Sequence, residues 1–155
     1  MSYVLRRSCR ISVERIRIPL DRGSEGLSGL RIALLTDFHG RAVGTSSTEY
    51  ADIVAFAPDI VCLGGDYVSS RPAQATALGP MLQGLSSLAP VYAVSGNHDH
   101  LAGWPEVAAF LEQRGAQVLS NRNVLLDHKG APFWLVGVDD PASGHADLTD
   151  ALPPG

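Results

Sequence analysis

The sequence predicts a single α/β domain in which helices cover a mostly parallel sheet. Three observations support this prediction. Short apolar runs alternate with helix-like stretches over residues 30–115, each apolar run ends in a polar cluster, and 155 residues suffice for one hydrophobic core. Ligands of such sheets bind beyond the carboxyl ends of the strands, so the polar clusters are the first candidates for a functional site.

The predicted elements begin near the N-terminus. Alternating apolar and charged residues predict a strand over about residues 10–20. The apolar run 32–35 predicts a strand that is buried on both faces. Ser46 and Glu49 have capping-box spacing, which predicts a helix from about Thr48 to Phe56.

The same alternation continues to about residue 115. The stretch IVCL at 60–63 predicts a second buried strand, and VYAVSG at 91–96 predicts a third. Leucines at helical spacing predict a helix over 73–88, although Pro80 interrupts its first turns. A further helix is expected over 104–114.

The remainder of the domain is predicted to be rich in β-structure. Residues from about 117 to 140 contain three strand-like stretches, QVLSN, NVLLDHKG and PFWLVGVDD. Lys129-Gly130 suits a hairpin turn, and a short helix is expected at 146–152. We therefore expect one domain, 1–155, with an N-terminal strand at 10–20, a motif-bearing part at 30–115 and a β-rich part at 117–140.

Composition excludes several classes of protein. The chain is 45% hydrophobic and 18% charged, and 12 Lys and Arg against 16 Asp and Glu give a net charge of −4. This balance argues against general nucleic-acid binding, so no nucleic-acid partner is expected. No apolar run approaches the roughly 20 residues of a membrane span, and the N-terminus lacks the apolar stretch of a signal peptide. We expect a cytoplasmic protein.

Polar residues capable of binding metal follow all three apolar runs. Asp37 and His39 follow the first, Asp66 the second, and Asn97 and His98 the third. Side chains two residues apart on an extended segment point the same way, which suits two ligands to one cation. The Asp66 carboxylate has two oxygens and can bridge two cations, Asn97 offers a neutral carbonyl oxygen, and His98 offers a ligand or a proton donor.

Oxygen and imidazole ligands without cysteine suit Mn, Fe or Zn. Two such ions about 3.5–4 Å apart clamp phosphate oxygens and lower the pKa of a shared water, whose hydroxide attacks phosphorus. A nearby imidazolium can then protonate the leaving oxygen. The residues thus indicate metal-assisted phosphoester chemistry.

The stretches TDFHG, LGGDYV and SGNHD resemble three signature blocks of the calcineurin-like metallophosphoesterases. The resemblance runs from about Leu30 to Asp140, and APDIVCLGGDYV, VYAVSGNHD and LVGVDDP fit its bacterial branch of YkuE- and YaeI-like phosphoesterases. It implies a sandwich of mixed sheets flanked by helices, two divalent metal ions (Mn, Fe or Zn), and hydrolysis of phosphomono- or diesters. The branch also hints at lipid-linked substrates and a location peripheral to the membrane.

The resemblance assigns a role to each of six residues, with Asp37 and His39 on the first metal, Asp66 as the bridge, Asn97 on the second metal, His98 near the leaving group, and Asp99 orienting His98.

The sequence departs from the family pattern in its second half. The family carries two later histidine blocks, one of Gly-His-x-His type, and no histidine after His100 stands in such a block here. We therefore expect that the C-terminal part of the fold is missing and that the second metal site is incomplete, and the sequence leaves open whether this chain alone is active or inactive.

The sequence allows three alternative interpretations. The chain could be a non-catalytic remnant that binds metal weakly or acts as an interaction domain. A hydrolase triad of Ser95, His98 and Asp99 is disfavoured, because three neighbours on one turn rarely reach triad geometry. A nucleotide-binding loop at LGGDYVSS is disfavoured, because it lacks the Gly-Lys-Ser/Thr ending of a P-loop.

Overall fold

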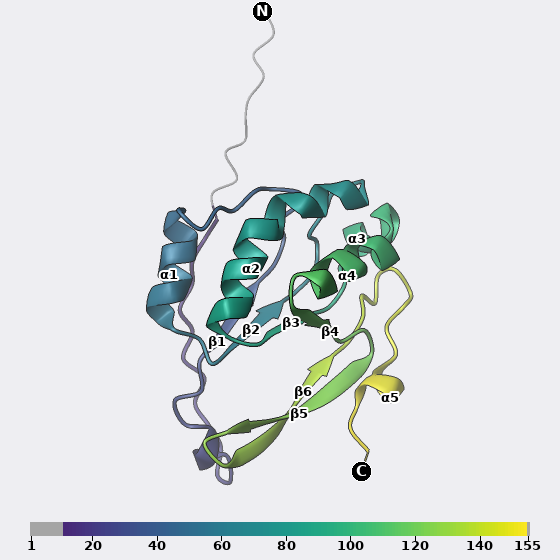
Figure 1. Ribbon diagram of the computed structural model, residues 1–155. Coiled ribbons are helices and arrows are strands. Elements are labelled where there is room, and N and C mark those ends of the chain that lie inside the picture. Colours follow the sequence, from purple (N-terminus) through teal and green to yellow (C-terminus); the bar gives the residue numbers. More distant parts are fainter. Residues whose placement is uncertain (1–10, 155) are drawn as a thin grey trace, which may run out of the picture.

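The computed structural model describes residues 11–154 and contains a four-stranded parallel sheet and a two-stranded antiparallel hairpin (Figure 1). The parallel sheet has the order β1-β2-β3-β4, with β1 at Ile32–Leu35, β2 at Ile60–Leu63, β3 at Val91–Ala93 and β4 at Ala116–Val118. The hairpin consists of β5 (Arg122–His128) and β6 (Ala131–Gly137).

Helices join the strands in the order that the sequence predicts, with the addition of helix α3 (Asn97–Ala102), which the sequence pattern did not predict. The α-helices are α1 (Thr48–Phe56), α2 (Gly79–Leu88), α3 (Asn97–Ala102), α4 (Trp104–Gln113) and α5 (Leu148–Ala151), and two 3-10 helices are η1 (Glu25–Leu27) and η2 (Pro72–Leu78). Within residues 11–154, no helix combines the length and the apolar character that crossing a membrane requires.

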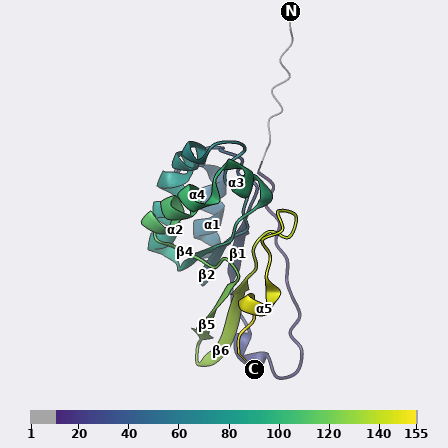
Figure 2. The ribbon, with the colours of Figure 1, turned by 90° about the vertical axis from the view of Figure 1, so that its right-hand side faces the viewer.

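The parallel sheet separates two apolar layers (Figure 2). Successive side chains of a strand point to opposite faces. On one face Val61 and Leu63 pack with Leu82 of α2 and Leu111 of α4 in the main core. On the other face a smaller cluster is formed by residues of the sheet and of the hairpin, namely Ile60, Tyr92 and Leu119 with Val124, Leu126, Phe133 and Leu135.

Two predicted helices are confirmed with changes at their starts. Helix α1 has the predicted bounds, but its N-cap is Ser47, not Ser46, and the Ser47 Oγ accepts a hydrogen bond from the Tyr50 N–H at 3.1 Å. The predicted helix 73–88 is divided into η2 and α2. Pro80 stands at the start of α2, where a residue without an N–H group is tolerated.

The predicted strand at 10–20 is wrong for the part that the structure describes. Residues 11–20 contain no strand, and Arg10 lies outside the described residues. Ile16 and Ile18 are 80% and 75% exposed. An alternating pattern gives a strand only where a neighbouring strand supplies hydrogen bonds and one face is buried, and neither condition is met here.

The strands of the β-rich part are divided between the two sheets. Residues 116–118 form the fourth strand of the parallel sheet, with Val91 opposite Ala116. The hairpin that follows is confirmed. Lys129 and Gly130 both have positive φ, 53° and 87°, as a two-residue hairpin turn requires.

His128, the last residue of β5, provides a test of this packing. The residue is 5% exposed, and its Nε2 is the one buried side-chain nitrogen or oxygen atom in residues 11–154 that lacks a hydrogen-bond partner. Leu has a similar volume and no polar atom, so His128→Leu is expected to raise the free energy of unfolding by about 1 kcal/mol. Urea unfolding would measure this change. A loss of stability would show that the nitrogen makes a favourable contact.

Candidate metal centre

The candidate site lies at the carboxyl ends of β1, β2 and β3. Asp37 and His39 follow β1, Asp66 follows β2, and Asn97 and His98 begin α3 directly after the β3 loop. Asp37, Asp66 and Asn97 line one hollow of about 320 Å³ at this edge. The convergence predicted from parallel strands is therefore present.

Three side chains approach one another closely enough to share a cation. Ligand atoms of His39, Asp66 and His98 all lie within 4.8 Å of one another. The His39 Nε2 is 3.7 Å from Asp66 Oδ2 and 3.8 Å from Asp37 Oδ1, and the His39 and His98 rings meet edge to face with centroids 4.8 Å apart. Carboxylate and imidazole donors fit Mn, Fe or Zn.

Three of the candidate ligands adopt an unusual backbone conformation. Asp37, His39 and Asp66 have φ of 62°, 49° and 57°, in the left-handed region that few residues other than glycine occupy. Hydrogen bonds between the two loops hold them there, since Asp37 N–H donates to Gly65 O at 3.1 Å and His39 N–H donates to Asp66 O at 2.8 Å. Strained conformations of this kind are typical of functional sites.

Two glycines allow the β2 and β3 loops to touch. A Cβ atom at Gly65 would overlap the backbone of Ser95 and Gly96, and a Cβ atom at Gly96 would overlap the Asp66 carboxylate. Gly65 also has φ of 94°. Both glycines are therefore required by close approach, and Asp66 is placed beside the start of α3.

The Asp99 carboxylate links these loops through hydrogen bonds to their backbone N–H groups. Asp99 is 0% exposed. Its Oδ2 accepts hydrogen bonds from the backbone N–H groups of Asp66 at 2.8 Å and Gly96 at 2.9 Å, and its Oδ1 accepts from Tyr67 at 2.9 Å and Val68 at 3.2 Å. One buried charge therefore fixes the β2 loop against the first turn of α3.

Burial raises the pKa of the Asp99 carboxyl, and the backbone hydrogen bonds, which favour the ionised form, offset only part of this rise. The predicted role of Asp99 is wrong, because its oxygens bind backbone N–H groups and not the His98 ring. The Nδ1 of His98 lies 3.2 Å from the carbonyl oxygen of Ser69, which orients the ring instead. The backbone N–H of His98 donates to Asp66 Oδ1 at 3.1 Å.

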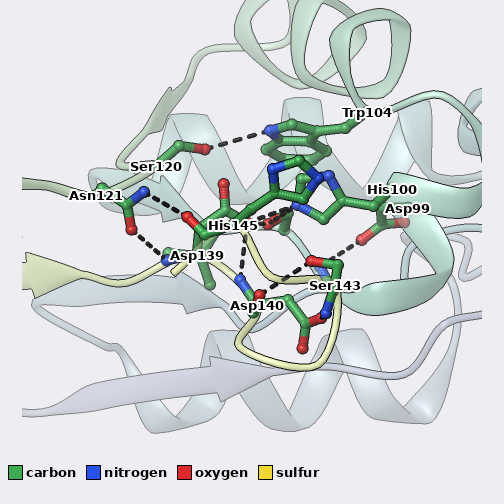
Figure 3. Close-up of polar contacts among 12 residues, drawn as sticks. Asp99, His100, Trp104, Ser120, Asn121, Asp139, Asp140, Ser143 and His145 are labelled. Atoms are coloured by element: carbon green, nitrogen blue, oxygen red, sulfur yellow. Dashed lines mark hydrogen bonds and ion pairs between the residues drawn. The ribbon is translucent and has the colours of Figure 1, made fainter. Parts of the chain in front are cut away.

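Two further polar residues were missed as site residues. Asp139 and Asp140 line the same hollow from the loop after β6. Asp139 Oδ1 accepts a hydrogen bond from Ser95 Oγ. The same oxygen lies 2.7 Å from His100 Nε2 (Figure 3). The Ser95 hydroxyl therefore hydrogen-bonds to Asp139 and not to His98, so the disfavoured triad is not formed. The available signal was that Asp139-Asp140 follows an apolar strand, as the other clusters do.

Comparisons with known proteins relate this chain to one family. The family model described as "Calcineurin-like phosphoesterase" matches residues 30–147. The chain is 28% identical over 146 residues to the uncharacterized metallophosphoesterase YkoQ of Bacillus subtilis, covering 90% of this chain and 54% of that protein. It is 31% identical over 138 residues to the phosphodiesterase YaeI of Escherichia coli, covering 84% of this chain and 51% of that protein.

Two other similarities cover smaller shares of the related proteins. A Danio rerio transmembrane protein with metallophosphoesterase domain is 32% identical over an alignment of 139 residues, which covers 81% of this chain and 30% of that protein. The crystal structure of a phosphopantetheinyl hydrolase from Mycobacterium tuberculosis superposes with a TM-score of 0.45 at 14% identity, covering 71% of this chain and 43% of the hydrolase. The chain spans about half the length, or less, of the curated relatives it matches.

The role of Asp99 can be tested by replacing its charge. In Asp99→Asn the amide NH₂ would face backbone N–H donors, so the free energy of unfolding is expected to fall by about 3 kcal/mol. Chemical denaturation would measure the loss. Asp127→Asn is the matched control, because Asp127 is exposed and accepts one backbone hydrogen bond, from Gly130 N–H. Equal small losses in both variants would contradict the proposed role.

Proposed function

We propose a metal-dependent phosphoesterase function for this chain, because it belongs to the calcineurin-like phosphoesterase family. The observation that carries the proposal is the convergence of His39, Asp66 and His98 within 4.8 Å of one another, beside Asp37, at the carboxyl edge of the sheet. The proposed reaction is hydrolysis of a phosphomono- or diester.

In this proposal Asp37 and His39 bind a first divalent metal ion, Asp66 bridges, and Asn97 contributes to a second site. The geometry that supports this assignment is the position of Asp66 Oδ2, 3.7 Å from His39 Nε2. Asn97 lines the same hollow as both carboxylates. When bound, such ions polarise phosphate oxygens and make water a stronger nucleophile.

His98 is proposed as the proton donor to the leaving oxygen. Its Nδ1 faces the Ser69 carbonyl oxygen, which can only accept, so Nδ1 carries a proton and Nε2 is the nitrogen that exchanges one. The edge-to-face contact with His39 places the ring at the rim of the candidate centre. Because the same contact brings His98 close to the proposed metal ligand His39, metal ligation is the competing role for His98.

A lipid-linked phosphoester at a membrane surface is the finer form of this proposal. Its support is the family relationship to a Danio rerio protein that is named as a transmembrane protein. Arg15 and Arg17 are exposed on the N-terminal segment and suit an anionic surface. The other clustered arginines, Arg6, Arg7 and Arg10, lie outside the described residues.

Asp66→Asn tests the proposed centre. Asn tolerates a left-handed backbone and keeps an oxygen for the His98 N–H, but it removes the bridging charge. We expect Mn²⁺ affinity, measured by titration calorimetry, to fall at least about tenfold, and Mn²⁺-dependent hydrolysis of bis(p-nitrophenyl) phosphate to be lost. Asp52→Asn on the exposed face of α1 is the control. Undiminished turnover in Asp66→Asn would exclude this site, and Mn²⁺ binding without turnover in the wild type would favour the non-catalytic alternative.

His98→Ala separates proton transfer from metal binding. As a proton donor, His98 should contribute about 10²-fold or more to kcat while leaving the Kd for Mn²⁺ within about twofold of the wild type. Parallel kinetics and calorimetry would measure both quantities. A large rise in Kd would instead assign His98 as a ligand.

A further inference from the structure

A second hollow lies next to the candidate metal centre. Its volume is about 330 Å³, and Asn97 lines both hollows, so they meet at the predicted ligand of the second metal. We call it the ring subsite, and it is lined by Asn97, His100, Leu101, Ala142, Ser143 and His145. None of these is Lys or Arg, so the subsite has no permanent cation to hold a second anionic group.

Two stacked imidazole rings form one wall of the ring subsite (Figure 3). The rings of His100 and His145 are nearly parallel, at 15°, with centroids 4.2 Å apart. His145 is exposed, while the His100 side chain is 13% exposed, so the stack ends at an accessible ring. Leu101 is 81% exposed and adds an apolar surface beside it.

Hydrogen bonds fix the His100 ring and the backbone of His145. His100 Nε2 lies 2.7 Å from Asp139 Oδ1 and 3.0 Å from Ser95 Oγ. Asn121 holds the loop that carries His145, since its Nδ2 donates to the His145 carbonyl oxygen at 2.8 Å and its Oδ1 accepts from Asp139 N–H at 3.0 Å. The wall is therefore anchored to the loops after β3 and β6 and to the β4–β5 connection.

We propose that the ring subsite binds a planar aromatic or heterocyclic group on the alcohol part of the phosphoester, with His145 as a specificity-determining residue. The inference rests on the proposed function, because the phosphate must lie at the adjoining metal centre. A flat ring can extend the stack on His145 and contact Leu101. A saturated group of similar size would gain contact with Leu101 but no stacking.

Calorimetry with non-hydrolysable probes tests this preference. In the presence of Mn²⁺ the wild-type chain is expected to bind phenylphosphonate about tenfold more tightly than methylphosphonate. His145→Ala should reduce this ratio to about twofold, whereas His145→Phe, which keeps a flat ring, should retain it. Equal affinities in the wild type, or an unchanged ratio in His145→Ala, would overturn the inference.

A metal-free measurement separates this inference from the proposed function. Benzyl alcohol, which has no phosphate, should shift the imidazole NMR signals of His100 and His145, and cyclohexylmethanol should not. These shifts without any Mn²⁺-dependent phosphonate binding would overturn the metal centre and support the subsite. Phosphonate binding without a ring preference would overturn the subsite and leave the metal centre intact. Failure of both measurements would overturn both.

Discussion

The candidate site depends on one buried carboxylate. The Asp99 carboxylate accepts hydrogen bonds from four backbone N–H groups, those of Asp66, Tyr67, Val68 and Gly96. It thereby joins the loop after β2 to the start of α3. An ionised group that is fully buried is costly unless its oxygens are satisfied, and here each oxygen accepts two hydrogen bonds. The positions of Asp66 and of the Asn97-His98 pair therefore follow from the side chain that lies beneath them.

The conformations of the loops around Asp99 position the candidate metal ligands but lower the stability of the native state. Asp37, His39 and Asp66 occupy the left-handed region, and Gly65 and Gly96 approach so closely that neither can carry a side chain. Such features raise the energy of the native state locally, and the core formed by α2, α4 and the parallel sheet offsets this cost. A rigid sheet thus holds strained loops in the geometry that metal ligation needs.

The second face of the sheet supports a different part of the candidate site, the ring subsite. The hairpin packs on it through Leu126 and Phe133, and the chain after β6 then returns to the carboxyl edge. This return brings Asp139 beside His100 and stacks His145 on the same ring. The chain after the hairpin therefore supplies the His145 ring of the subsite wall, whereas α3 supplies the His100 ring.

Local patterns in the sequence were sufficient to predict the strands β1, β2 and β3, helix α1, the hairpin turn and the cluster of Asp37, His39, Asp66, Asn97 and His98, because periodicity, capping and turn residues act over a few positions. The prediction that β1 is buried on both faces is wrong, because β1 is an edge strand that the hairpin cluster does not cover, and Ile32 and Leu34 are 46% and 69% exposed. Local patterns were insufficient where partners are distant in the chain. Asp99 binds residues about 33 positions away, and His100 meets Asp139 39 positions away. The exposed segment 11–20 has a strand pattern without a pairing partner. Pairing, burial and long-range hydrogen bonds belong to the tertiary structure, since each needs a second segment that no local pattern specifies.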